Sequence, residues 1–173
     1  MYSSLIDVIK SKNKTLFILC GFPYSGKTYI AKKLVEATGC EYVGIDDFFY
    51  EREYDWTSNK LPNQEGWNEI FTAAYDAIKK KLRESKNVLY DSTNHTRASR
   101  DALRAVAQEI GVESAVIFVD VSTKTVWSRW EDNQTSRERP IVAKELVAMT
   151  IDSFERPMED ENVYTVIPVK PHE

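Results

Sequence analysis

The amino-acid sequence predicts an α/β protein with three layers, in which a parallel β-sheet of five strands is covered by helices on both faces. Two observations support this fold class. Short apolar runs alternate along the 173 residues with segments whose apolar residues recur at helical spacing, and such alternation requires a parallel sheet with right-handed crossovers. A glycine-rich string, Gly21–Thr28, lies between the first apolar run and the first helical segment, which is typical of phosphate-binding loops in α/β proteins.

The expected elements follow in chain order from the same two patterns. The apolar run Leu16–Cys20 predicts a buried strand, and the segment Tyr29–Val35 predicts a helix. Strands are expected near residues 16–20, 42–45, 87–91, 114–120 and 163–167. Helices are expected near residues 27–37, 66–84, 97–110, 122–133 and 142–155, and the pattern allows a short helix at 3–11.

Two segments, residues 46–66 and 132–140, match neither pattern. The first is rich in acidic and aromatic residues, and the second is polar and carries arginines. Ligands of open α/β sheets bind beyond the carboxyl ends of the strands. Both segments can reach that edge, so we expect functional residues in them.

Length and composition indicate one soluble domain that spans residues 1–173. The chain is 42% hydrophobic and 29% charged, without a signal-peptide pattern or an apolar run near the ~18 residues of a membrane span. Cys20 and Cys40 indicate buried thiols in a reducing compartment, so we expect a cytoplasmic protein. Two histidines without a Cys/His cluster disfavour a structural zinc site. A net charge of −4 disfavours broad non-specific binding of nucleic acid.

The string Gly21–Thr28 fits G-x-x-x-x-G-K-[ST], the pattern of the nucleotide-binding P-loop. Eight residues are expected to bind the nucleotide: Gly21, Phe22, Pro23, Tyr24, Ser25, Gly26, Lys27 and Thr28. The loop and the helix N-terminus after it direct backbone N–H groups at a polyphosphate. Lys27, expected in an exposed loop position, would reach the β- and γ-phosphates, and the Thr28 hydroxyl would bind Mg²⁺. The sequence therefore predicts ATP and Mg²⁺ as cofactors.

Carboxylates stand at the ends of two expected strands. Asp46 follows the second strand, and Asp91 ends the third. Asp46 is expected to serve as the base or orienting acceptor for an attacking hydroxyl, with Asp47 as the alternative, and Asp91 to hold Mg²⁺ or its water. Because Asp also favours helix N-caps, capping is the structural alternative for Asp46 and Asp91.

Arginines gather around residues 132–141, where we expect a lid. Arg137 and Arg139 would meet the charge that develops on the transferring phosphoryl group. Arg129 would either join them or position the lid. The structural alternative is surface charge balanced by nearby acids.

Three further groups of residues have structural interpretations beside functional ones. One helical stripe of arginines is formed by Arg97, Arg100 and Arg104. A solvated face is favoured for this stripe over contact with phosphate or RNA. Trp127 and Trp130 share a helix face and are expected in the core. The aromatic residues at 48–56 fit a satellite core or an acceptor pocket.

Taken together, these motifs resemble the small P-loop kinase superfamily, whose members include phage-type polynucleotide 5′-kinases, zeta-toxin-like kinases, chloramphenicol phosphotransferase and seryl-tRNA kinases. The motifs are Gly21–Thr28, Ile45-Asp46-Asp47, Asp91-Ser92-Thr93-Asn94, and the string Asn133…Arg137…Pro140…Phe154-Glu155-Arg156-Pro157. The resemblance extends from Leu16 to about Pro168. It implies the strand order 2-3-1-4-5, a catalytic Asp at Asp46, and lid arginines at Arg137 and at Arg129 or Arg139.

The function expected from these residues is an ATP-dependent kinase that transfers the γ-phosphate to a hydroxyl of a small molecule, without a membrane partner. A polynucleotide 5′-hydroxyl or tRNA kinase is the first alternative. Polynucleotide kinases carry an arginine shortly after the catalytic Asp, whereas this chain has Phe48-Phe49-Tyr50 there, with Arg52 nearest. The second alternative is a nucleotide-dependent switch or binding ATPase without an acceptor.

Overall fold

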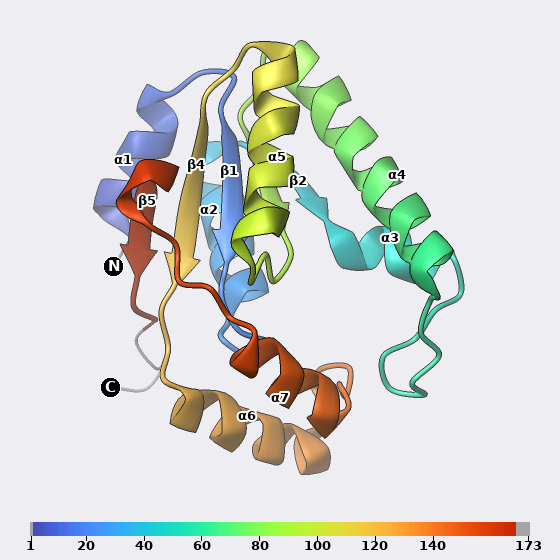
Figure 1. Ribbon diagram of the computed structural model, residues 1–173. Helices are drawn as coiled ribbons and strands as arrows, with labels where there is room; N and C mark the ends of the chain where they lie inside the picture. The colour runs from blue at the N-terminus through green and yellow to red at the C-terminus, as the bar shows by residue number, and fades with distance from the viewer. Residues whose placement is uncertain (1, 169–173) are drawn as a thin grey trace.

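The computed structural model describes residues 2–168 and contains one sheet of five parallel strands in the order β2-β3-β1-β4-β5 (Figure 1). The strands are β1 (Leu16–Cys20), β2 (Glu41–Gly44), β3 (Val88–Asp91), β4 (Ser114–Val119) and β5 (Val163–Val166). The helices are α1 (Ser3–Ser11), α2 (Lys27–Thr38), α3 (Ile45–Glu51), α4 (Gln64–Arg83), α5 (Arg97–Ile110), α6 (Thr123–Ser136), α7 (Lys144–Asp152) and the 3₁₀ helix η1 (Glu159–Glu161). The predicted α/β fold and the strand order 2-3-1-4-5 are confirmed.

The central strand β1 is buried along its whole length because strands flank it and helices cover both of its faces. Its side chains alternate between two core clusters, as the two-residue period of a strand requires. Ile18 packs in the cluster that contains residues of α4 and α5, and Phe17 packs in the one that contains residues of α1 and α2. Figure 1 shows α5 in front of the sheet and α2 behind it. The protein therefore has the three layers that the sequence predicts.

Residues 46–66 differ from the expectation because they include a helix, α3, which the sequence reasoning missed. Its first turn carries Asp46 and Asp47, and acidic side chains stabilise the positive end of a helix. Phe49 of this helix is fully buried and stacks on Trp56, with ring centroids 4.4 Å apart and an interplanar angle of 10°. A seven-residue helix is too short to show a clear helical period in the sequence, which explains why it was missed.

The expected lid is also more structured than predicted. Helix α6 continues to Ser136, into the segment that was expected to be irregular, and α7 begins at Lys144. The turn between the two helices starts at Arg137, which has a left-handed backbone with φ +51°. Only residues 137–143 therefore connect α6 to α7.

The arginines of the stripe on α5 all form ion pairs, and one of them is fully buried. Arg100 is fully buried and donates from Nε and Nη2 to the Glu161 carboxylate at 2.6 and 3.2 Å. Arg97 and Arg104 pair with Asp101, and Arg97 also pairs with Asp160. The prediction of a solvated face is wrong for Arg100 because its partner, Glu161, lies in η1, far along the chain.

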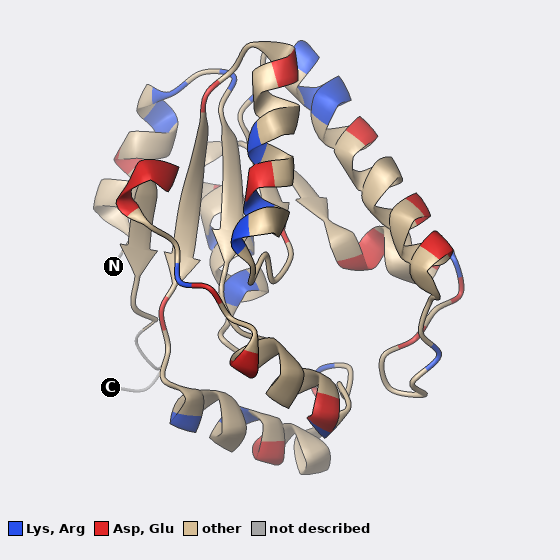
Figure 2. Ribbon diagram, in the orientation of Figure 1, with Lys and Arg blue, Asp and Glu red and all other residues tan. Residues whose placement is uncertain are grey.

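Two further features of the helices are their length and apolar character, and the distribution of charge along them. Among the described residues, no helix is both long and apolar enough to span a bilayer. Charges of both signs occur along α4 and α5 (Figure 2), and α4 places Glu65 in its first turn and Lys80, Lys81 and Arg83 in its last. That arrangement complements the helix dipole, so these lysines and Arg83 have a structural role in α4.

Candidate active site

The P-loop links β1 to α2 at the carboxyl edge of the sheet. Gly26 has a left-handed backbone with φ +98°, which glycine adopts without strain. A Cβ atom at Gly21 would lie 2.9 Å from the Val119 carbonyl oxygen, so a side chain there would force the loop away from β4. Ser25 Oγ is buried and has no hydrogen-bond partner among the described residues. The loop is therefore a backbone cradle at the N-terminus of α2, the geometry that binds phosphates.

Lys27 lies inside this cradle, and the expectation that it would be exposed is wrong. The residue is 8% exposed, and its Nζ donates to the carbonyl oxygens of Gly21 at 3.0 Å and Phe22 at 2.6 Å. Burial lowers the pKa of Lys27, while the nearby charge of Asp91 opposes that shift. Lys27 is the first residue of α2, so the loop wraps around its side chain. Thr28 follows it on the exposed side of the first turn.

Asp91 ends β3 and points into the protein, with 6% exposure. Its Oδ2 accepts a hydrogen bond from the Tyr42 hydroxyl at 2.9 Å. Thr96, not Asp91, caps α5, because its side chain accepts from the Ser99 N–H. The capping alternative for Asp91 is therefore wrong.

Asp46 lies in the first turn of α3, and the N-cap position of that helix is occupied by Gly44. Capping is therefore wrong for Asp46 as well. Its Oδ1 accepts a hydrogen bond from the indole Nε1 of Trp56 at 3.2 Å. Although the side chain is accessible to solvent, surrounding protein atoms displace water from it and raise its pKa, and the Trp56 bond opposes this shift. The indole of Trp56 thus bonds Asp46 and not its neighbour Asp47.

The three expected lid arginines occupy different environments. Arg129 of α6 is half-buried and donates from Nη1 to the P-loop carbonyls of Tyr24 at 3.0 Å and Ser25 at 2.8 Å. Burial lowers the pKa of Arg129, and the charge of Arg139 adds to the effect. Arg137 and Arg139 are both exposed, but only Arg139 lines the pocket beside the P-loop. The structure thus brings Arg129 and Arg139 together and leaves Arg137 outside the pocket.

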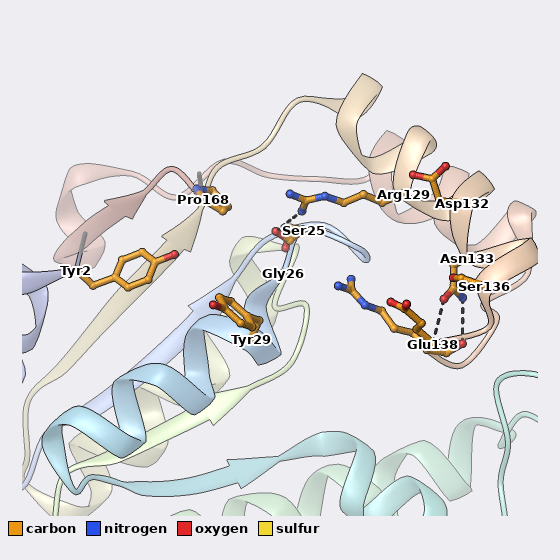
Figure 3. Close-up of a pocket in the computed structure, with 11 residues that line it drawn as sticks. Tyr2, Ser25, Gly26, Tyr29, Arg129, Asp132, Asn133, Ser136, Glu138 and Pro168 are labelled. Carbon is orange, nitrogen blue, oxygen red and sulfur yellow. Dashed lines mark hydrogen bonds between the residues drawn. The ribbon is translucent and has the colours of Figure 1, made fainter. Parts of the chain in front are cut away.

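A pocket of about 260 Å³ adjoins the P-loop. Figure 3 shows Ser25 and Gly26 at its centre, Arg129 across from Tyr29, and Asn133 and Glu138 at the lid end. Two of its residues come from opposite ends of the described chain, namely Tyr2 and Pro168. Sequence reasoning missed Tyr2, Tyr29 and Pro168 because no motif marks them. Tyr29 directly follows the P-loop in sequence, whereas only the fold brings Tyr2 and Pro168 to it.

Comparison with known proteins places this geometry in a family. Residues 16–157 match the family described as AAA domain. The chain belongs to this AAA-domain family. The AAA-domain protein also has the fold of the small P-loop kinases, so the resemblance stated from the sequence is confirmed.

Three relatives of this AAA-domain protein are informative. It is 26% identical to a probable gluconokinase of Schizosaccharomyces pombe over 160 residues, which cover 91% of this chain and 81% of the relative. A gluconokinase from Sinorhizobium meliloti 1021 matches with TM-score 0.66 and 19% identity, covering 91% of this chain and 85% of that one. A chain of the Pnkp1/Rnl/Hen1 RNA repair complex matches with TM-score 0.67 and 19% identity, covering 80% of this chain and 43% of that one. These matches identify a P-loop kinase and leave its acceptor to be inferred.

Proposed function

We propose that residues 1–173 form a single kinase domain that transfers the γ-phosphate of ATP to a hydroxyl of a small molecule. The observation that carries the proposal is Asp46, an accessible carboxylate that no helix cap uses and that Trp56 orients at the carboxyl edge of the sheet. Its charge acts on Lys27 inside the P-loop. A carboxylate in that place can accept the proton of, or orient, a hydroxyl that attacks the γ-phosphate.

The residues of the P-loop fit a nucleoside triphosphate and Mg²⁺. The backbone cradle at Gly21 and the buried Ser25 Oγ offer donors to phosphate oxygens, and the Thr28 hydroxyl and Asp91 carboxylate supply the oxygen ligands that Mg²⁺ prefers. Among the described residues there is no group of three His, Cys, Asp or Glu side chains that would bind a metal. Mg²⁺ would arrive with the nucleotide, where it neutralises charge on the phosphates.

The remaining residues receive the following roles. Lys27 would exchange its bonds to loop carbonyls for the β- and γ-phosphates, and Arg129 and Arg139 would meet the charge of the transferring group. The pocket extends from Tyr2 to the lid residues: its end at Tyr2 and Tyr29 would take the nucleoside end of ATP, and its lid end, which Arg139 lines, would lie over the phosphates. Arg137 is a weaker candidate because it lies outside that pocket. The two buried free thiols, Cys20 and Cys40, support a cytoplasmic location.

A small polyhydroxy acid is the first acceptor to test, since two of the similar proteins are described as gluconokinases. A polynucleotide 5′-hydroxyl is the second candidate, because the fold also matches a chain of an RNA repair complex. One contact argues against this second acceptor. Arg52 is the first arginine after Asp46 in the sequence, and its Nη1 donates to the Phe48 carbonyl oxygen at 3.0 Å. That bond holds the Arg52 guanidinium against the last turn of α3, so the group would have to break it to bind an acceptor phosphate.

A screen with labelled ATP and Mg²⁺ tests the proposal. Gluconate, other sugar acids, polyols and 5′-hydroxyl oligonucleotides are offered as acceptors to the wild-type protein and to the variants Asp46→Asn and Asp47→Asn. We expect label in a small hydroxyl compound, lost in Asp46→Asn and retained in Asp47→Asn. Label in oligonucleotides alone would favour the second acceptor. ATP hydrolysis that no acceptor changes would indicate a switch and overturn the proposal.

A further inference from the structure

Tyr24, at a variable position of the P-loop, has a side chain that serves the lid rather than the phosphate cradle. Its ring is buried with Val126 of α6 and Val147 of α7. The residue has a left-handed backbone with φ +60°. For a bulky residue this conformation costs free energy and persists only where surrounding contacts compensate for it. The contacts of the Tyr24 side chain must therefore compensate for its backbone conformation.

The Tyr24 hydroxyl binds the lid segment, which we define as residues 137–142, through both of its hydrogen-bonding capacities. It donates to the Pro140 carbonyl oxygen at 3.2 Å and accepts from the Val142 N–H at 3.1 Å. The main chain of Tyr24 is held at the same time, because Arg129 donates to its carbonyl oxygen at 3.0 Å. Tyr24 thus joins the P-loop to α6 and to the lid segment.

Helix α6 holds the other side of the lid segment. Asn133 is 4% exposed, and its side chain bonds both backbone groups of Arg139, each at 3.0 Å. The Trp130 indole N–H donates to the Val142 carbonyl oxygen at 2.9 Å. These bonds fix the backbone of Arg139 relative to α6. The position of α6 and the lid segment relative to the P-loop then depends on the contacts of Tyr24 and Arg129.

We propose that Tyr24 is a positioning residue that fixes the lid arginines relative to the P-loop through its hydroxyl. The inference rests on the proposed kinase function. If the P-loop closes around a triphosphate, the lid segment would move with it, because Tyr24 belongs to the P-loop and its hydroxyl bonds the lid segment. Correct placement matters because donors aimed at developing charge lose their effect when they are displaced.

The first test is amide hydrogen exchange of the nucleotide-free protein, which does not require activity. Tyr24→Phe keeps the buried ring and removes only the hydroxyl. We expect the Val142 amide to exchange about 3- to 10-fold faster, the range for loss of one net hydrogen bond. The Arg139 amide, held by Asn133, should exchange as before. Tyr164→Phe on β5 is the matched control and should leave both amides unchanged. An unchanged Val142 amide in Tyr24→Phe would overturn the proposal.

The second test is steady-state turnover together with binding of a non-hydrolysable ATP analogue. We expect Tyr24→Phe to lower kcat about 3- to 10-fold while KM for ATP changes little, because the hydroxyl bonds the lid and not the nucleotide. Wild-type kcat combined with wild-type protection of the lid segment by the analogue would overturn the role. If the wild-type protein phosphorylates no acceptor, the kinase proposal fails, and analogue protection still decides the positioning role. Should Tyr24→Phe not fold, Tyr24→Leu, which keeps an apolar side chain in the cluster and also lacks the hydroxyl, must give the same two effects.

Discussion

The buried ion pair between Arg100 of α5 and Glu161 of η1 gives the sharpest prediction of stability. Both side chains are fully buried, and two hydrogen bonds join them. Arg100 also donates to the Asn94 carbonyl oxygen at 3.0 Å, next to the P-loop strand. Glu161 accepts in addition from the Met158 N–H at 2.8 Å. The pair thus ties the end of β3 to the segment that leads into β5.

The variant Arg100→Met keeps much of the side-chain volume and removes the charge. Glu161 then stays buried with its negative charge and loses both bonds to the guanidinium. Breaking a buried pair in this way costs ~3–5 kcal/mol in the free energy of unfolding. For a domain of this size we expect a melting temperature about 6–20 °C lower. Replacing both partners by methionine should recover most of the loss, because no buried charge is then left without a partner.

Chemical denaturation of the wild type, both single variants and the double variant measures these energies. Arg104→Met, which removes a more exposed pairing with Asp101, is the control and should cost less than about 1 kcal/mol. A similarly small loss in Arg100→Met would refute the reasoning. The pH dependence gives a further check. Burial raises the pKa of Glu161, but the bonds from Arg100 and the Met158 N–H, together with the charges of Arg100 and Arg97, outweigh burial and lower the pKa. The contribution of the pair is therefore present above the ordinary value of 4.5 and is lost as the pH falls below it.

Three other predictions concern the candidate site. Asp46→Asn should lower turnover about 10²-fold with little change in ATP affinity, and Asp47→Asn should not; equal effects of the two would refute the assignment of the base. Trp56→Phe should shift the acidic limb of the plot of turnover against pH to higher pH. The indole bond lowers the pKa of Asp46, and a base must be ionised to work. An acidic limb at the wild-type pH would contradict this role. Arg139→Ala should lower kcat about 10²-fold and Arg137→Ala clearly less, since only Arg139 lines the pocket; the reverse order in single-turnover measurements would contradict the assignment.

The sequence predicts best what local patterns encode. The P-loop and the buried strand before it were predictable because a fixed motif and an apolar run mark them. The strand ends that carry Asp91 and precede Asp46 were predictable for the same reason. Their capping alternatives could be excluded only by the structure, which places Thr96 and Gly44 at the two N-caps.

Features that depend on distant partners were not predictable in this way. Arg100 appears as a surface arginine because its partner, Glu161, lies 61 residues further along the chain. Lys27 appears exposed in a loop motif, yet the loop folds around its ammonium group. Tyr2 and Pro168 meet at the pocket only through the order of the strands. In each case a contact between distant segments sets the environment of the residue, and the local pattern gives no sign of that contact.

The four tryptophans of the chain lie in two pairs whose intrinsic fluorescence can report on two regions of the protein. Trp56 and Trp67 stack around Phe49 beside Asp46, whereas Trp127 and Trp130 lie near each other on α6, where Trp130 also bonds the backbone before α7. Indole emission responds to polarity and to hydrogen bonding at Nε1, so one pair would report changes beside Asp46, the proposed acceptor side, and the other changes beside residues 137–142, the proposed lid. Variants that retain one pair would allow stopped-flow fluorescence to time acceptor entry and lid movement in the same turnover without an added dye.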